Sequence, residues 1–184
     1  MNLRAVQTPL EGLWIVETVV FHDARGYLAE GYHEAKYRDL GISCRFVQDN
    51  QSYSKKGVLR GLHAQWKHPQ AKLVQVVSGD IFDVTVDARP ESPTFGKWFG
   101  VRLSGENLKQ LFIPTGFLHG FCVLSDEAFV QYKNSDVYVP DDQLGVIWND
   151  PNLAIDWPVR EPILSPKDAA NIPWSQAMTK LRTR

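Results

Sequence analysis

Short apolar runs, many of them alternating or β-branched, follow one another along the chain and are separated by turn residues. Runs of this kind predict about ten strands, at residues 13–20, 27–32, 45–53, 57–63, 72–77, 81–87, 97–103, 110–113, 120–124 and 129–133. The breaks between them contain glycine or proline, as in Ser78-Gly79-Asp80 and Pro114-Thr115-Gly116. Many short strands with regular turn signals are typical of sandwiches and jelly rolls. The pattern therefore predicts an all-β fold rather than an α/β fold.

Helical signals are confined to two short segments. Residues 33–40 have mild helical spacing and end before Gly41, a suitable residue for the C′ position. A second helix is predicted to begin at Ser165, with Pro166 in its first turn and Asp168 at the N3 position. No linker, repeat or low-complexity segment interrupts the chain. We therefore predict one domain over residues 1–184 with a few short helices.

Composition and charge narrow the class of protein. Hydrophobic residues make up 43% and charged residues 22%, as in an ordinary globular domain with a substantial core. The net charge of -1 argues against a nucleic acid or an acidic membrane as partner, because either favours a basic face. We find no apolar run of membrane-spanning length and no signal peptide. Cys44 and Cys122 are interpreted as free thiols rather than a disulfide, so the protein is expected in the cytoplasm.

The candidate chemistry is concentrated between residues 57 and 72. Arg60 suits a phosphate group, which its planar guanidinium binds through two hydrogen bonds. His63 suits proton transfer near neutral pH, and Lys72 suits a developing oxyanion. We expect these residues on two adjacent strands, with their side chains directed into one cavity. This arrangement indicates proton chemistry on a phosphorylated ligand.

Two segments, residues 61–79 and 114–120, resemble the paired motifs of the cupin jelly roll. In metal-binding cupins the first motif carries a His-x-His pair and a glutamate. Here no second histidine follows His63 and no glutamate precedes Gly79. A transition-metal site usually needs three or four ligands, and only His63 and His119 stand at suitable places. The sequence therefore predicts a cupin-like fold without a bound metal, and it shows no signature of another cofactor.

Motifs along nearly the whole chain identify a family. They include Phe46-Val47-Gln48-Asp49-Asn50-Gln51-Ser52, Val58-Leu59-Arg60-Gly61-Leu62-His63, Gln70-Ala71-Lys72-Leu73-Val74, Gly116-Phe117-Leu118-His119-Gly120-Phe121, Trp148-Asn149-Asp150-Pro151 and Leu164-Ser165-Pro166-Lys167-Asp168. Through them the chain resembles the dTDP-4-dehydrorhamnose 3,5-epimerases, cofactor-independent isomerases of dTDP-L-rhamnose biosynthesis with a cupin-like jelly roll. Ala64, Phe112 and Gln143 depart from the usual family residues, which are an aromatic residue, a tryptophan and a glutamate. These departures concern the fit to the sugar or the nucleotide.

The resemblance implies roles for four residues. A 4-keto sugar has acidic C–H bonds at C3 and C5, because either carbanion delocalises onto the C4 oxygen. By resemblance His63 is the base, Tyr132 the acid at C5, Lys72 the partner of the enolate and Asp168 the carboxylate that orients His63. Each also has a structural interpretation. Asp168 suits a helix cap, His63 and His119 suit core histidines, Lys72 suits a snorkelling strand end, and Tyr132 suits a core aromatic residue.

The resemblance also implies contacts with a dTDP-sugar. Arg25, Arg60 and Lys167 are the candidates for the diphosphate, although Arg25 and Lys167 are equally interpreted as solvated surface charges. Gln48 and Asn50 are candidates for the sugar or the base, and Tyr138 for stacking on thymine. The remaining candidate contacts are Glu30, His119 and Gln143. Since Arg25 and Glu30 lie on a segment that reaches toward the neighbouring subunit in the family, a homodimer is implied.

Three rival functions remain open. One is a C3-only or C5-only epimerase of a related dTDP-4-keto-6-deoxysugar. Another is a non-catalytic jelly-roll module that binds nucleotide sugars, which the set of His63, Lys72, Tyr132 and Asp168 disfavours because binding needs neither an acid nor a base. A metal-dependent cupin is the third and lacks its ligands.

Overall fold

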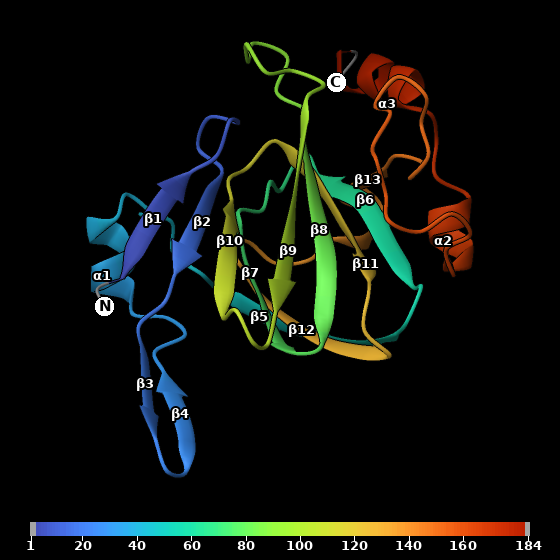
Figure 1. The fold of residues 1–184 in the computed structure, drawn as a ribbon. Helices are drawn as coiled ribbons and strands as arrows, with labels where there is room; N and C mark the ends of the chain where they lie inside the picture. The colour runs from blue at the N-terminus through green and yellow to red at the C-terminus, as the bar shows by residue number, and fades with distance from the viewer. Residues whose placement is uncertain (1–2, 183–184) are drawn as a thin grey trace.

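Two antiparallel sheets form the body of the computed structural model, which describes residues 3–182 (Figure 1). The six-stranded sheet has the order β1 (Arg4–Gln7), β2 (Trp14–Glu17), β10 (Lys109–Ile113), β7 (Lys72–Ser78), β12 (Glu127–Asn134) and β5 (Gln48–Lys55). The five-stranded sheet has the order β13 (Gln143–Gly145), β6 (Leu59–Gln65), β11 (Phe117–Val123), β8 (Asp80–Asp87) and β9 (Trp98–Ser104). This architecture confirms the predicted all-β, cupin-like jelly roll.

Apolar side chains fill the space between the sheets. Val74 and Val130 of the six-stranded sheet meet Ile81 and Phe121 of the five-stranded sheet in one buried cluster. A second cluster lies on the other face of the five-stranded sheet, where Trp174 belongs to the C-terminal segment that covers it. Because both faces of β8 are covered, its residues are buried almost continuously rather than alternately.

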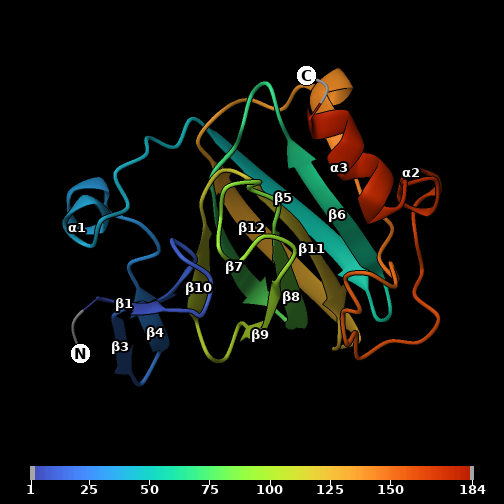
Figure 2. The same ribbon diagram turned by 90° about the horizontal axis from the view of Figure 1, so that it is seen from above.

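The helices are short. They are α1 (Glu34–Asp39), the 3₁₀ turn η1 (Pro140–Asp142), α2 (Pro166–Ala169) and α3 (Trp174–Arg182). Seen from above, α2 and α3 lie on the side of β6, away from α1 (Figure 2). The predicted stop of α1 is confirmed, since Gly41 follows it with a φ of 94°, where a side chain is strained. The predicted start of α2 is also confirmed, with Ser165 as its N-cap.

Some elements differ from the prediction. The sequence did not indicate β1, β13 or α3, and the predicted extended run at residues 13–20 is divided between β2 and the start of β3. The expectation that Arg60, His63 and Lys72 lie on adjacent strands was wrong. β6 carries the first two residues and β7 carries Lys72, and these strands belong to opposite sheets. The side chains therefore meet across the barrel instead of side by side.

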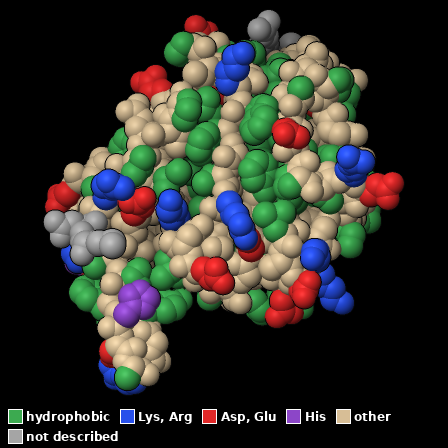
Figure 3. All heavy atoms as spheres, viewed as in Figure 1, with side chains coloured by type: hydrophobic (Ala, Val, Ile, Leu, Met, Phe, Trp, Pro, Cys, Tyr) green, Lys and Arg blue, Asp and Glu red, His purple; other side chains and the backbone are tan. Residues whose placement is uncertain are grey.

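A separate hairpin of β3 (Val20–Asp23) and β4 (Gly26–Ala29) projects from the body as a narrow arm (Figures 1 and 3). Three large hydrophobic side chains on it are exposed, with Phe21 at 62%, Tyr27 at 52% and Leu28 at 71%. The two cysteines are free, in agreement with their interpretation. Within residues 3–182 no helix combines the length and the apolar character needed to cross a membrane.

Candidate functional site

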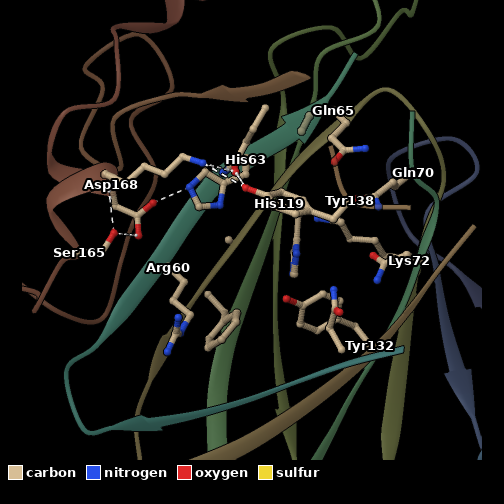
Figure 4. Close-up of a pocket in the computed structure, with 17 residues that line it drawn as sticks. Arg60, His63, Gln65, Gln70, Lys72, His119, Tyr132, Tyr138, Ser165 and Asp168 are labelled. Atoms are coloured by element: carbon tan, nitrogen blue, oxygen red, sulfur yellow. Dashed lines mark hydrogen bonds and ion pairs between the residues drawn. The ribbon is translucent and has the colours of Figure 1, made fainter. Parts of the chain in front are cut away.

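One end of the space between the sheets opens into a cavity of about 330 Å³ (Figure 4). Its walls come from β5, β7 and β12 of one sheet, from β6 and β11 of the other, and from the segment around α2. Ten of the predicted site residues line it, namely Asn50, Arg60, His63, Lys72, His119, Tyr132, Tyr138, Gln143, Lys167 and Asp168. The cavity predicted for Arg60, His63 and Lys72 is therefore present, and seven other candidate residues share it.

His63 and Asp168 form a hydrogen-bonded pair on one wall of the cavity. The Nε2 atom of His63 contacts Oδ1 of Asp168, and a carboxylate can only accept there, so Nε2 carries the proton. The second ring nitrogen, Nδ1, is then left with a free lone pair. Although burial raises the pKa of Asp168, its hydrogen bond and charge interaction with His63 hold that pKa below the ordinary value. This geometry suits a histidine that accepts a proton.

The first turn of α2 holds Asp168 in place. Its backbone N–H donates to Ser165 Oγ at 3.0 Å, which is the cap predicted from the sequence. Ser165 Oγ in turn donates to Asp168 Oδ2 at 2.9 Å, so the two carboxylate oxygens have different partners. The two interpretations of Asp168, a helix cap and a partner of His63, are therefore compatible, because the backbone serves one and the carboxylate the other.

Lys72 extends into the cavity from the opposite sheet (Figure 4). Burial lowers the pKa of its ammonium group to about 8, and the negative charge of Asp83 opposes that effect. An ammonium that is poorly hydrated interacts more strongly with a nearby anion than one in water. The ammonium group of Lys72 is therefore better suited to stabilise an oxyanion than the ammonium group of a surface lysine.

A second histidine–carboxylate pair lies deeper in the barrel. His119 Nε2 contacts Oδ2 of Asp83 at 2.8 Å, and Asp83 is fully buried. The sequence analysis did not single out Asp83. A signal was present, because Asp83 interrupts the apolar strand β8, and a buried carboxylate usually has a partner. The partner itself was not visible in the sequence, since β8 and β11 pair across a large sequence separation.

Tyr132 stands on β12, opposite the sheet that carries His63 (Figure 4). Burial raises the pKa of its phenol, while a hydrogen-bonding interaction with Asn50 and the charge of Arg60 lower it in part. Its phenol therefore stays protonated at neutral pH and is able to donate. Arg60 is itself held by bonds to Ser54 Oγ at 2.9 Å and to a backbone carbonyl at 3.2 Å.

A polar cluster forms the rim of the cavity. Gln143 Oε1 accepts from the Tyr138 hydroxyl at 2.8 Å and from Lys167 Nζ at 2.7 Å. The backbone N–H of Tyr138 donates to Gln48 Oε1 at 2.9 Å, which places Gln48 behind the rim rather than on the cavity surface. Gln143 carries no charge, so its hydrogen bond with Lys167 does not offset the positive charge of Lys167 at the rim.

Arg25 and Glu30 lie outside the cavity of their own chain. Arg25 is 90% exposed near the tip of the arm, where it pairs with Asp23. Glu30 pairs with Lys36 of α1. Among residues 3–182 no group of three histidine, cysteine, aspartate or glutamate side chains is arranged to hold a metal ion.

Comparisons with known proteins agree on one family. A sequence model of the family described as dTDP-4-dehydrorhamnose 3,5-epimerase matches residues 7–176. An enzyme of that name from Methanothermobacter thermautotrophicus is 51% identical over 170 residues, which cover 91% of this chain and 92% of the relative. One from Shigella flexneri is 49% identical, with 90% and 93% covered. The crystal structure of the Legionella pneumophila 3,5-epimerase with dTDP-4-keto-L-rhamnose superposes with a TM-score of 0.94 at 48% identity, covering 98% of this chain and 97% of that one.

Proposed function

The chain belongs to the dTDP-4-dehydrorhamnose 3,5-epimerase family and is an isomerase of dTDP-L-rhamnose biosynthesis, and we propose that its cavity is the catalytic site. One observation carries the assignment. A histidine of one sheet, supported by the carboxylate of Asp168 in α2, faces a phenol and a half-buried ammonium of the other sheet. A reaction that removes a proton from one face of a sugar and returns one to the other face needs this disposition.

Each group has one step in the proposed reaction. His63 Nδ1 takes the proton from the carbon beside the ketone, and the electron pair of that C–H bond moves onto the C4 oxygen. Lys72 stabilises the enolate that forms. Tyr132 then gives its proton to C5 from the opposite face. A positioned acid or base contributes about 10²- to 10⁴-fold in rate, and one oxyanion donor about 10²- to 10³-fold.

The rim is proposed to bind the nucleotide. Arg60 and Lys167 supply positive charge for the diphosphate, and Tyr138 presents an aromatic ring for the base. The structure of the Legionella pneumophila relative with a dTDP-sugar supports this proposal. Asn50, His119 and Gln143 complete the proposed polar lining around the sugar and the nucleotide. Gln48 supports this lining from behind through its hydrogen bond to Asn50.

We further propose a cytoplasmic homodimer in which residues 1–184 act as one domain. The arm supports a dimer, because its exposed Phe21 and Leu28 are apolar side chains that a partner subunit would cover. In such a dimer Arg25 and Glu30 reach the partner's cavity, which accounts for their position outside their own. Two free cysteines and a nucleotide-linked substrate suit the cytoplasm.

The test is to incubate the protein with dTDP-4-keto-6-deoxyglucose in D₂O and to locate deuterium by NMR. We expect deuterium at both C3 and C5, and we expect the rate to be unchanged by EDTA. Deuterium at one carbon only would establish the single-carbon alternative. Neither exchange nor turnover, with dTDP still bound, would establish a binding module.

Variants assign the base in the same experiment. His63→Ala is expected to lower exchange at both carbons by about 10²-fold or more, while dTDP affinity is largely kept. His33→Ala is the matched control, because His33 is exposed at the start of α1 and makes no side-chain cap. Near-normal exchange in His63→Ala would remove His63 from the mechanism.

A further inference from the structure

Behind Tyr132 two side-chain amides are joined in series to one backbone N–H. The N–H of Tyr138 donates to Gln48 Oε1 at 2.9 Å. Gln48 Nε2 then donates to Asn50 Oδ1, also at 2.9 Å. Asn50 stands directly opposite Tyr132 in the pairing of β5 with β12, and both side chains line the cavity. The side chains of Asn50 and Tyr132 also have a hydrogen-bonding interaction, so the series ends beside the Tyr132 hydroxyl.

The direction of the series follows from chemistry alone. A backbone N–H can only donate, so the Gln48 atom that meets it must be the carbonyl oxygen. The other end of the Gln48 amide is then the NH₂ group, which also can only donate. The Asn50 atom that meets Gln48 is therefore its oxygen, and the free end of Asn50 is its NH₂ group.

We propose that Asn50 and Gln48 are positioning residues, and that Asn50 Nδ2 donates a hydrogen bond to the phenol oxygen of Tyr132 so that the hydroxyl proton points into the cavity. The proposal rests on the proposed role of Tyr132 as the acid at C5. An amide oxygen at the same place would draw the phenol proton toward β5 and away from the sugar. The backbone of Tyr138 thus selects, through two amides, the direction in which Tyr132 donates.

The same bond supports Tyr132 after it has donated. That step leaves Tyr132 as a phenolate, and the NH₂ group of Asn50 stabilises the phenolate by donating a hydrogen bond to its oxygen. The hydrogen-bonding interaction with Asn50 lowers the pKa of Tyr132, in opposition to burial, as this role requires. A variant at position 48 or 50 is best judged against controls that leave the other charged or titratable groups of the cavity wall in place. These are Arg60, His63, Lys72, His119, Tyr138, Lys167 and Asp168.

Gln48→Glu is the sharpest test, because it reverses the series without removing Asn50 or Tyr132. A carboxylate at 48 still accepts from the Tyr138 N–H but cannot donate to Asn50. Asn50 then turns its NH₂ group toward position 48 and presents its oxygen to Tyr132. We expect inversion at C5 to fall at least tenfold relative to deuterium exchange at C5 by His63, and the pKa of Tyr132 to rise. Tyrosines labelled with ¹³C at Cζ report that pKa, and Tyr132→Phe assigns the signal.

Gln51→Glu is the matched control. It adds the same charge to the same strand, but Gln51 is exposed and its side chain alternates to the opposite face of β5. Gln48→Met, which removes the donor and adds no charge, is expected to lower the ratio of inversion to exchange less than Gln48→Glu does, and it also serves if Gln48→Glu does not fold.

The ratio of inversion to exchange cancels any change in nucleotide affinity. An unchanged ratio in Gln48→Glu, or an equal fall in Gln51→Glu, would overturn the positioning role. If Gln48→Glu does not fold, an unchanged ratio in Gln48→Met overturns it instead. Loss of both exchange and inversion in the unmodified protein would refute the proposed function itself, which is a separate result.

Discussion

The charge of Lys72 should set the upper pH limit of the reaction. With a pKa of about 8, about nine-tenths of the Lys72 side chains carry a proton at pH 7, half at pH 8 and about one-tenth at pH 9. If the ammonium is the group that stabilises the enolate, kcat/KM falls about tenfold for each pH unit above 8. We call this fall in kcat/KM above pH 8 the alkaline limb of the pH profile. Tyr132 cannot produce the limb, because burial raises the pKa of its phenol above the ordinary value near 10.

Two substitutions move the limb in different ways. Lys72→Arg keeps the positive charge at every pH used, so the limb near pH 8 disappears even if the reaction is slower. Asp83→Asn removes the negative charge that raises the pKa of Lys72, so the limb moves to lower pH. Lys72→Met should lose about 10²- to 10³-fold at pH 7, as expected for one oxyanion donor.

The assay is kcat/KM between pH 6 and 10 with the 4-keto sugar, with circular dichroism at each pH to verify that the fold is kept. Tyr53→Phe is a suitable reference, since it alters a single exposed hydroxyl that bonds Glu127 outside the cavity. A limb near pH 8 that persists unchanged in Lys72→Arg would refute the reasoning, because another group would then have to be titrating.

Two further predictions concern buried aspartates. Asp168→Asn lets an amide NH₂ face His63 Nε2, which favours the tautomer with the proton on Nδ1, the atom proposed as the base. We therefore expect kcat to fall by about 10²- to 10⁴-fold. A fall of less than about threefold in stopped assays would contradict the role of this pair. Asp142→Ala removes the acceptor of three backbone N–H groups in residues 66–68 and should lower the free energy of unfolding by about 1–3 kcal/mol in urea titrations, whereas exposed Asp141→Ala should not. Burial raises the pKa of Asp142, but those hydrogen bonds bring it below its ordinary value, so its contribution is lost as the pH falls and the difference between the two variants should shrink in acid.

Alternation and turn residues predicted most strands, but not which sheet holds each strand. β6 and β7 are consecutive in the chain and could have formed a hairpin, yet each pairs with distant strands. The alternation of apolar and polar residues shows which side chains share one face of a strand. It does not show which strand or sheet packs against that face. The missed strands β1 and β13 have four and three residues, of which only two and one are apolar, so neither contains an apolar run or an alternation that indicates a strand.

Ten of the candidate site residues line the cavity, whereas Arg25, Glu30 and Gln48 do not, and the arrangement was predicted only in part. The cap at Ser165 could be recognised because all its residues lie within one helical turn. The contact between Asp168 and His63 joins residues 105 positions apart, and only the family resemblance indicated it. The pair of His119 and Asp83 and the series from Tyr138 to Asn50 depend on strand register, which no local pattern specifies.

Buried polar groups around His119, next to the cavity, oppose folding. Asp83 Oδ1 and Thr85 Oγ1 are buried without a hydrogen-bond partner among the described residues. The desolvation of the Lys72 ammonium, which lowers its pKa to about 8, also costs stability at neutral pH. Since the shift makes the unfolded chain bind more protons between pH 8 and 10.5, this loss diminishes as the pH rises through that window. Lys72→Met should therefore stabilise the fold at pH 7 while it impairs the reaction. A desolvated ammonium interacts more strongly with the negative charge of an enolate than a hydrated one does. The desolvation that lowers the stability of the fold therefore also increases the stabilisation of the reaction intermediate.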